Sequence, residues 1–109
     1  MKADVGGERG FTRVALAGEI DLNRVPKVRR EILRQVDAGH SVLVDLSEVS
    51  YLDSSGVATL VEGFQAARTQ GLEFAVTGVS EAAMRVLNLS RLDQVLPIIE
   101  NAGAHDRHA

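Results

Sequence analysis

The chain has no cysteine, no tryptophan and very few aromatic residues. Of its 109 residues, 4% are aromatic and none is Cys or Trp. The absence of thiols excludes disulfides, thiol nucleophiles and zinc–thiolate sites, and it suits a reducing compartment. The scarcity of aromatic rings argues against the stacking platforms that hold single-stranded nucleic acid.

Long apolar runs and a strong positive charge are also missing. No stretch approaches the roughly 18 apolar residues that mark a membrane-spanning helix, and residues 1–4 do not open a signal peptide. The net charge of −3 provides no overall basic field for DNA or an anionic membrane. We therefore expect a cytoplasmic protein with no nucleic-acid partner and no direct membrane insertion.

What remains is the composition of one small globular domain. Hydrophobic residues make up 45% and charged residues 25% of the chain, which excludes intrinsic disorder and fibrous repeats. The length fits a single domain, which we place at residues 1–100. Residues 101–109 are small and polar without a hydrophobic period, so we expect them to form a frayed tail.

Apolar periodicity predicts an alternation of strands and helices. Alternating or β-branched runs predict strands at 2–5, 11–17, 41–46, 72–77 and 95–99. Apolar residues at three- and four-residue steps predict three helices, which begin near Asn23, after Asp53 and after Ser80, with Asn23 and Ser80 as candidate caps. Pro97 cannot donate to a strand ladder, so the last strand is expected to lie at a sheet edge or to be broken there. Residues 47–52 are expected to form a loop, and Leu89 to face the core. This order favours an α/β fold whose mixed sheet opens with a hairpin.

Basic residues are concentrated in the first predicted helix. Between residues 24 and 34 only Glu31 opposes five cations, which are Arg24, Lys27, Arg29, Arg30 and Arg34. The simplest interpretation is a solvated helix face.

The segment Asp53-Ser54-Ser55-Gly56 is the most unusual local pattern in the chain. It lies between a predicted buried strand and a helix, where α/β folds present functional groups. Asp and Ser are good helix caps, which is the simplest structural explanation. One cap suffices, however, so at least one serine hydroxyl is left at the positive end of a helix, where a phosphate is well received.

Residues 43–57, LVDLSEVSYLDSSGV, resemble the signature of the STAS domain family, named for sulphate transporters and anti-sigma factor antagonists. Gly18-Glu19-Ile20-Asp21 and the segments 77–80 and 86–92 are similar to other family elements, so the resemblance spans about residues 11–98. It implies the STAS fold, a mixed sheet of four to five strands with three to four helices packed mainly on one face.

The resemblance is closest to the anti-sigma factor antagonists, and it implies specific roles for this segment. Ser54 matches the serine that is phosphorylated in antagonists, with Ser55 as second choice. The kinase is the anti-sigma factor itself, an ATP-dependent serine kinase, and a metal-dependent phosphatase removes the phosphate. The unphosphorylated antagonist binds the anti-sigma factor and so releases a sigma factor. The implied partner-binding residues are Asp21, Asp53, Ser54, Ser55 and Gly56.

Two other roles of STAS domains remain open at this point. One is the cytosolic subunit of a phospholipid ABC transporter, and the other is a component of a stress-signalling assembly. The paired serines favour the antagonists, for which we expect a monomer or weak homodimer. Many antagonists end in a helix, whereas residues 100–109 offer little apolar surface for one.

Catalytic and metal sites find little support in the sequence. His105 and His108 are three residues apart but lie in the polar tail without further ligands. His40 with Ser54 and Asp53 suggests a hydrolase, yet the G-x-S-x-G elbow is missing. We therefore expect no enzyme activity, no cofactor and no metal.

Overall fold

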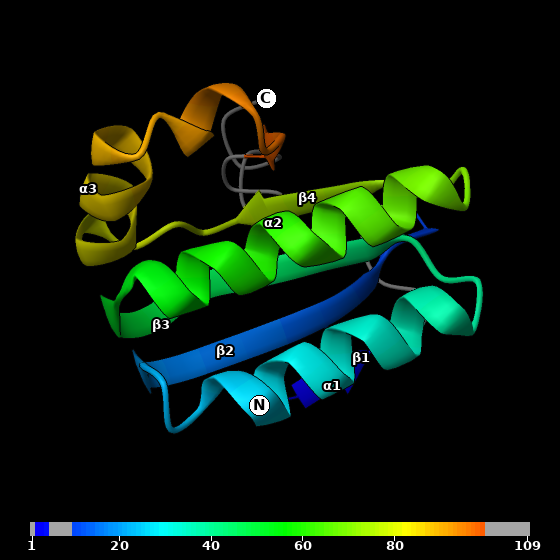
Figure 1. Cartoon of the computed structure of the whole chain (residues 1–109), viewed down its shortest axis with the longest axis horizontal. Coiled ribbons are helices and arrows are strands. Elements are labelled where there is room, and N and C mark those ends of the chain that lie inside the picture. The colour runs from blue at the N-terminus through cyan, green and yellow to red at the C-terminus, as the bar shows by residue number, and fades with distance from the viewer. Residues whose placement is uncertain (1, 5–9, 100–109) are drawn as a thin grey trace, which may run out of the picture.

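A five-stranded mixed sheet forms the centre of the computed structural model, which describes residues 2–4 and 10–99 (Figure 1). The strands lie side by side in chain order, and only β1 runs antiparallel to its neighbour. The strands are β1 (Lys2–Asp4), β2 (Thr12–Ile20), β3 (Val42–Leu52), β4 (Phe74–Thr77) and β5 (Ile98–Ile99). The expected mixed α/β fold with an opening hairpin is confirmed.

The order of the parallel strands along the chain decides which face of the sheet the helices cover. They are α1 (Val25–Asp37), α2 (Ser54–Thr69), α3 (Glu81–Leu89) and the short 3₁₀ helix η2 (Leu92–Gln94). Crossover connections between parallel strands are right-handed. Because each parallel strand is added on the same side of the one before it, the connecting helices lie on the same face of the sheet. In Figure 1, α1 and α2 lie next to each other over the sheet, and both begin at the edge where β2 and β3 end.

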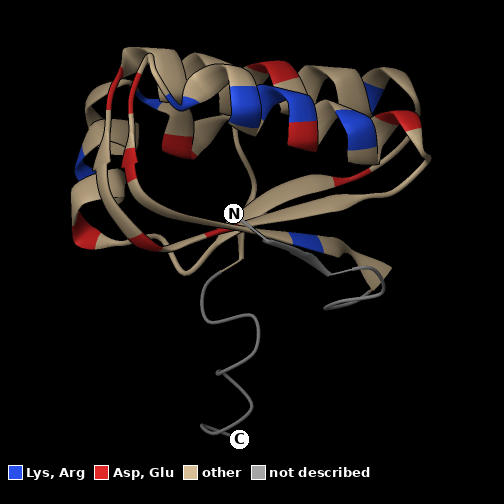
Figure 2. Ribbon diagram, turned by 90° about the horizontal axis from the view of Figure 1, so that it is seen from below, with Lys and Arg blue, Asp and Glu red and all other residues tan. Residues whose placement is uncertain are grey.

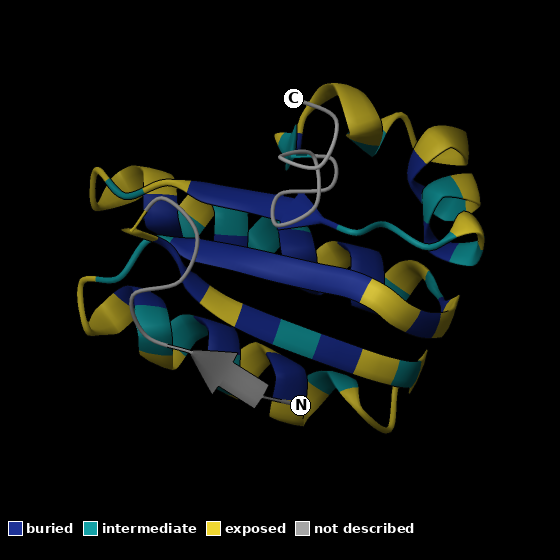
Figure 3. Cartoon of the chain, turned by 180° about the vertical axis from the view of Figure 1, so that it is seen from behind, coloured by how far each residue is buried: buried dark blue, intermediate teal, exposed yellow. Residues whose placement is uncertain are grey.

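The main core fills the space between the sheet and these helices. Alternate residues of β2 face it, and α1 contributes a buried stripe at every fourth residue, Val28, Ile32 and Val36. Leu60 of α2 and Leu87 of α3 join the same cluster. A smaller cluster of Phe11, Leu43 and Ala75 covers part of the opposite face, so the start of β3 is buried on both sides (Figure 3).

Three local predictions are wrong. Helix α1 begins at Val25, and neither Asn23 nor any other side chain caps it; instead the Asp21 carboxylate accepts the Asn23 amide in the preceding turn. Residues 47–52 are not a loop, because β3 continues beside β2 to Leu52. Leu89, expected to face inward, is 81% exposed at the end of α3.

Other local predictions hold. Ser80 caps α3 through the Ala83 amide. The last strand lies at a sheet edge as expected, but it is confined to Ile98–Ile99 after Pro97 and does not cover the predicted residues 95–97. The predicted tail at 101–109, its histidines and residues 5–9 of the glycine-rich segment lie outside the described residues. Within residues 2–4 and 10–99, no helix has both the length and the apolar character needed to cross a membrane.

Gly63 lets α2 approach both α1 and the sheet. A Cβ at this buried position would lie 2.7 Å from Ile32 Cγ2 and 2.8 Å from Phe74 Cε2. Both atoms belong to tightly packed core side chains, and Phe74 also makes an edge-to-face contact with Phe64. A side chain at residue 63 would therefore force the α1–α2–β4 junction apart.

We predict that Gly63→Ala destabilises the protein by about 1–2 kcal/mol, because overpacking outweighs the gain in helix propensity. The free energy of unfolding, measured by urea denaturation, tests this. Gln65→Ala on the exposed side of the same helix is the control and should change stability by less than about 0.5 kcal/mol. A Gly63→Ala protein as stable as the wild type would show that the junction tolerates the methyl group.

Candidate functional site

Two acidic residues, Asp21 and Asp53, directly follow the ends of the neighbouring strands β2 and β3. The strands are parallel, and their last pair is Ile20 with Leu52. The Asp53 amide then donates to the Ile20 carbonyl over 3.3 Å, so Asp21 and Asp53 follow adjacent strand ends. Figure 2 shows acidic segments in red at this end of the sheet. The structure therefore brings Asp21 and the segment that begins at Asp53 to the same end of the sheet.

Asp53 caps helix α2 with a single carboxylate oxygen. Its Oδ1 accepts the backbone amides of Ser55 and Gly56, each at 3.0 Å, and the Ser55 hydroxyl at 2.5 Å. These donors, the Ser55 hydroxyl first, hold the pKa of Asp53 below its usual range because they stabilise the ionised form. Two of the helix's free N-terminal amides are thereby satisfied within the chain.

The two adjacent serines have different environments. Ser54 is exposed at the first position of α2, and its hydroxyl makes no hydrogen bond among the described residues. Ser55 is half-buried, and its hydroxyl donates to Asp53. Asp53 therefore orients the Ser55 hydroxyl and leaves the Ser54 hydroxyl available to an incoming protein.

Gly56 permits the close approach of α2 to the strand ends. A Cβ there would lie 2.6 Å from Leu52 Cδ1 and 3.2 Å from the Ile20 carbonyl oxygen. Gly56 is buried, so it supports the site by packing and offers no surface of its own.

Asp21 shapes the loop between β2 and α1. Its Oδ1 accepts the amides of Asn23 at 3.0 Å and Arg24 at 3.3 Å, and these bonds hold the turn that precedes α1. The turn leaves Leu22 73% exposed. Tyr51, two residues before Asp53, is 49% exposed. Leu22 was not predicted as a site residue. Its position outside the apolar period of α1 indicates that it is exposed.

Asp45 is a buried carboxylate that the sequence analysis treated only as part of a strand. It is 5% exposed, forms an ion pair with Arg13 and accepts the Ser47 amide at 2.9 Å. These contacts satisfy it within the sheet. Its signal in the sequence is a single acidic residue inside the apolar run of residues 42–46.

The hydrolase arrangement does not assemble. His40 precedes β3, at the opposite end of that strand from Asp53, and its Nδ1 lies 2.9 Å from Gln35 Oε1. Among residues 2–4 and 10–99, no group of three His, Cys, Asp or Glu side chains is arranged to hold a metal ion.

Comparison with known proteins identifies the family. The STAS domain family matches residues 2–104, nearly the whole chain. This chain is a STAS domain. An anti-sigma-B factor antagonist of Listeria monocytogenes is 34% identical over 86 residues, which cover 78% of this STAS domain and 75% of that protein.

Solved structures agree with the family assignment. An anti-sigma factor antagonist from Mycobacterium paratuberculosis is 26% identical, with a TM-score of 0.73 over 89% of this STAS domain and 83% of that chain. The antagonist SpoIIAA in its unphosphorylated form is 19% identical, with a TM-score of 0.77 over 97% and 93% of the two chains. Its phosphorylated form also matches, with a TM-score of 0.71 over 99% and 98% of the chains at 19% identity. The STAS family and fold expected from residues 43–57 are therefore confirmed.

The Asp53 cap predicts a pH-dependent stability. Because the pKa of Asp53 is lower in the folded than in the unfolded protein, its contribution is complete above about pH 4 and is lost as the pH falls through the folded value. Asp53→Ala should therefore lower the free energy of unfolding at pH 7, and the difference from wild type should shrink in acid. Urea denaturation at a series of pH values measures this.

Ser80→Ala is the control, since it removes a neutral hydroxyl that accepts the Ala83 amide at 3.2 Å and donates to the Val49 carbonyl at 2.7 Å. Its cost of about 1–3 kcal/mol should be similar at every pH, because neither bond involves a group that titrates in acid. A difference between wild type and Asp53→Ala that persists unchanged to low pH would contradict the assignment of the cap to the ionised carboxylate.

Proposed function

We propose that this STAS domain is an anti-sigma factor antagonist whose binding to an anti-sigma factor is switched by phosphorylation of Ser54. The observation that carries the proposal is the exposed Ser54 hydroxyl, beside a second serine that is already bonded to Asp53. The relatives named antagonists support the role, and the existence of SpoIIAA in both an unphosphorylated and a phosphorylated form supports the switch.

The surface around Ser54 is suited to a protein partner. Asp21 and Asp53 offer carboxylates at one edge of the sheet, while Leu22 and Tyr51 add exposed apolar surface from the same strand ends. Protein interfaces commonly combine an apolar centre with a polar rim. We place the anti-sigma factor on this surface, where it would cover Ser54.

A phosphate on Ser54 would act mainly through its charge. The carboxylate of Asp53 already accepts the amides of Ser55 and Gly56, so those donors are not free to neutralise a phosphate on the neighbouring residue. The modification adds about −1.5 to −2 charges at neutral pH beside Asp53. A partner would have to desolvate that charge next to carboxylates, and like charges across an interface cost several kcal/mol. Binding is lost while the fold is kept.

In this scheme the chain is a substrate and not an enzyme. The anti-sigma factor acts as the ATP-dependent kinase: the Ser54 oxygen forms a bond to the γ-phosphorus of ATP, the bond to the β-phosphate oxygen breaks, and ADP and the hydroxyl proton leave. A metal-dependent phosphatase hydrolyses the phosphoserine and restores the hydroxyl. We place the cycle in the cytoplasm, where ATP and the sigma factor are found.

We predict that Ser54→Asp weakens binding to the proposed anti-sigma factor partner by at least about tenfold, the effect of 1.4 kcal/mol. Ser54→Ala should bind within about twofold of the wild type. The substitution adds no charge, and the hydroxyl that it removes is exposed and has no partner among the described residues. Calorimetric titration measures both affinities, and thermal unfolding of each variant checks that the fold is retained. Equal affinity of the two variants would refute the switch.

We also predict that the kinase modifies Ser54 and leaves Ser55 unmodified, because the Ser55 hydroxyl is held by the Asp53 carboxylate. Incubation with the anti-sigma factor, ATP and Mg²⁺, followed by mass spectrometry of peptides, locates the phosphate. Ser55→Ala should still be phosphorylated and Ser54→Ala should not. A phosphate found on Ser55 of the wild type would overturn this assignment.

A further inference from the structure

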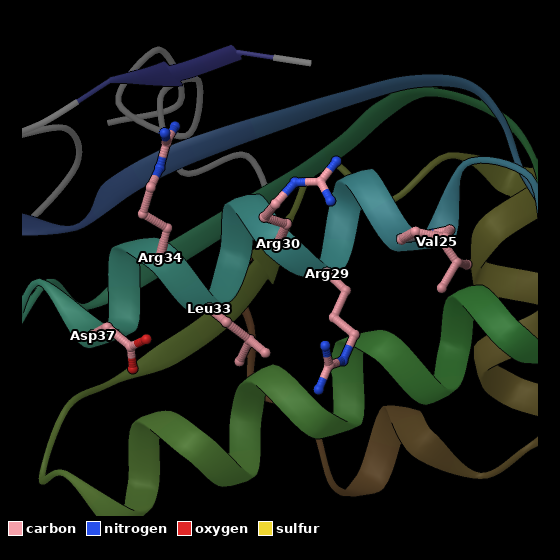
Figure 4. A pocket seen from close by; sticks show the side chains of 7 residues that line it. Val25, Arg29, Arg30, Leu33, Arg34 and Asp37 are labelled. Carbon is pink, nitrogen blue, oxygen red and sulfur yellow. The ribbon is translucent and has the colours of Figure 1, made fainter.

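Helix α1 carries a groove on its outer side, separate from Ser54. The groove has a volume of about 660 Å³, and all of the residues that line it belong to α1. Figure 4 shows their side chains, which are those of Val25, Pro26, Arg29, Arg30, Leu33, Arg34 and Asp37. Val25 and Leu33 supply an apolar floor. In Figure 4, Arg29 points toward α2, whereas Arg30 and Arg34 point to the other side of α1. The sequence predicts only a solvated helix face for these cations.

The three arginines of the groove are held differently. Arg29 donates to both carboxylate oxygens of Glu62 on α2, at 2.8 and 2.7 Å, which fixes its guanidinium in place. Arg34 pairs with Glu31 on its own helix. Arg30 is exposed and has no ion-pair or hydrogen-bond partner among the described residues. The groove therefore contains a cation with unused bonding capacity beside apolar side chains.

The charge of this surface contrasts with that of the whole chain. The protein carries a net charge of −3, and yet basic segments follow α1 while acidic segments gather at the end of the sheet (Figure 2). An anionic ligand would thus be drawn to α1 and repelled from the strand ends. The apolar floor and Asp37 at the far end of the groove make it a poor fit for a uniform polyanion, because one end repels negative charge.

We propose that this groove binds an acidic amphipathic helix of a partner protein. Val25 and Leu33 are eight residues apart, about 12 Å along the helix. An apolar pair at i and i+7 on a second helix has a similar spacing, and glutamates beside that pair would face Arg30 and Arg34. This is the helix-in-groove mode of recognition, in which apolar anchors are flanked by matching charges.

The groove is a second interaction surface, and its use does not depend on the phosphorylation of Ser54. Helices α1 and α2 begin at the same edge of the sheet (Figure 1). All of the residues that line the groove belong to α1, and none of them is bonded to Asp53, Ser54 or Ser55 among the described residues. A partner could therefore remain bound to α1 while the Ser54 surface is switched.

The test uses a fluorescently labelled helical peptide of about 18 residues. It carries leucines at i and i+7 flanked by glutamates, and a control peptide carries lysine at each glutamate position. Anisotropy should show binding of the acidic peptide and not of the lysine peptide, and amide NMR shifts should map the contact to α1. Arg30→Glu should weaken binding by at least about tenfold, and Leu33→Ala should weaken it independently of charge.

Arg85→Glu is the matched control, since Arg85 is exposed on α3 and its replacement changes the net charge equally. This variant and Ser54→Asp should each bind the acidic peptide within about twofold of wild type. Equal losses in Arg30→Glu and Arg85→Glu, binding of the lysine peptide, or NMR shifts outside α1 would overturn the proposal. So would sedimentation showing that α1 is covered by a second copy of the chain. None of these outcomes bears on the Ser54 switch, which is measured with the anti-sigma factor.

Discussion

The carboxylate of Asp53 closes the junction between the central strand and the second helix, because one oxygen accepts two backbone amides and the Ser55 hydroxyl. The amide of the same residue is bonded to the end of β2. Asp53 therefore joins β3 to the end of β2, caps the start of α2 and orients the Ser55 hydroxyl. The different environments of Ser54 and Ser55 follow directly from this cap, since the carboxylate binds one hydroxyl and leaves the other exposed.

The junction also explains how a modification could change binding without changing the fold. The amides of Ser55 and Gly56 at the start of α2 already donate to Asp53, so they are not free to form hydrogen bonds with a phosphate on Ser54. The buried glycine at residue 56 seats the helix start against Leu52 and Ile20. The site is held in place by packing and carries charged groups at its surface, which suits the proposed role of a surface that other proteins modify.

Much of this site could be predicted from the sequence because it is local. A short polar residue before an amphipathic helix commonly caps it, and Asp53 and Ser80 both satisfy amides as expected. Asn23 failed as a cap because Asp21, two residues earlier, had the geometry to bind the amides of the turn. The second half of β3 was missed because residues 47–52 lack a continuous apolar run, and pairing with β2 is what holds them extended.

The sequence by itself determined the alternation of strands and helices, the lack of thiol chemistry and the position of the serine pair, since composition, periodicity and capping act over a few neighbouring residues. Only the tertiary structure decided which of the two hydroxyls has no partner among residues 2–4 and 10–99, and which apolar residues are exposed beside it. It also decided that the cations of α1 line a groove in which Arg30 has no partner among those residues. Those properties depend on contacts between distant segments, such as Arg29 with Glu62 and Asp53 with Ile20, which no local pattern encodes.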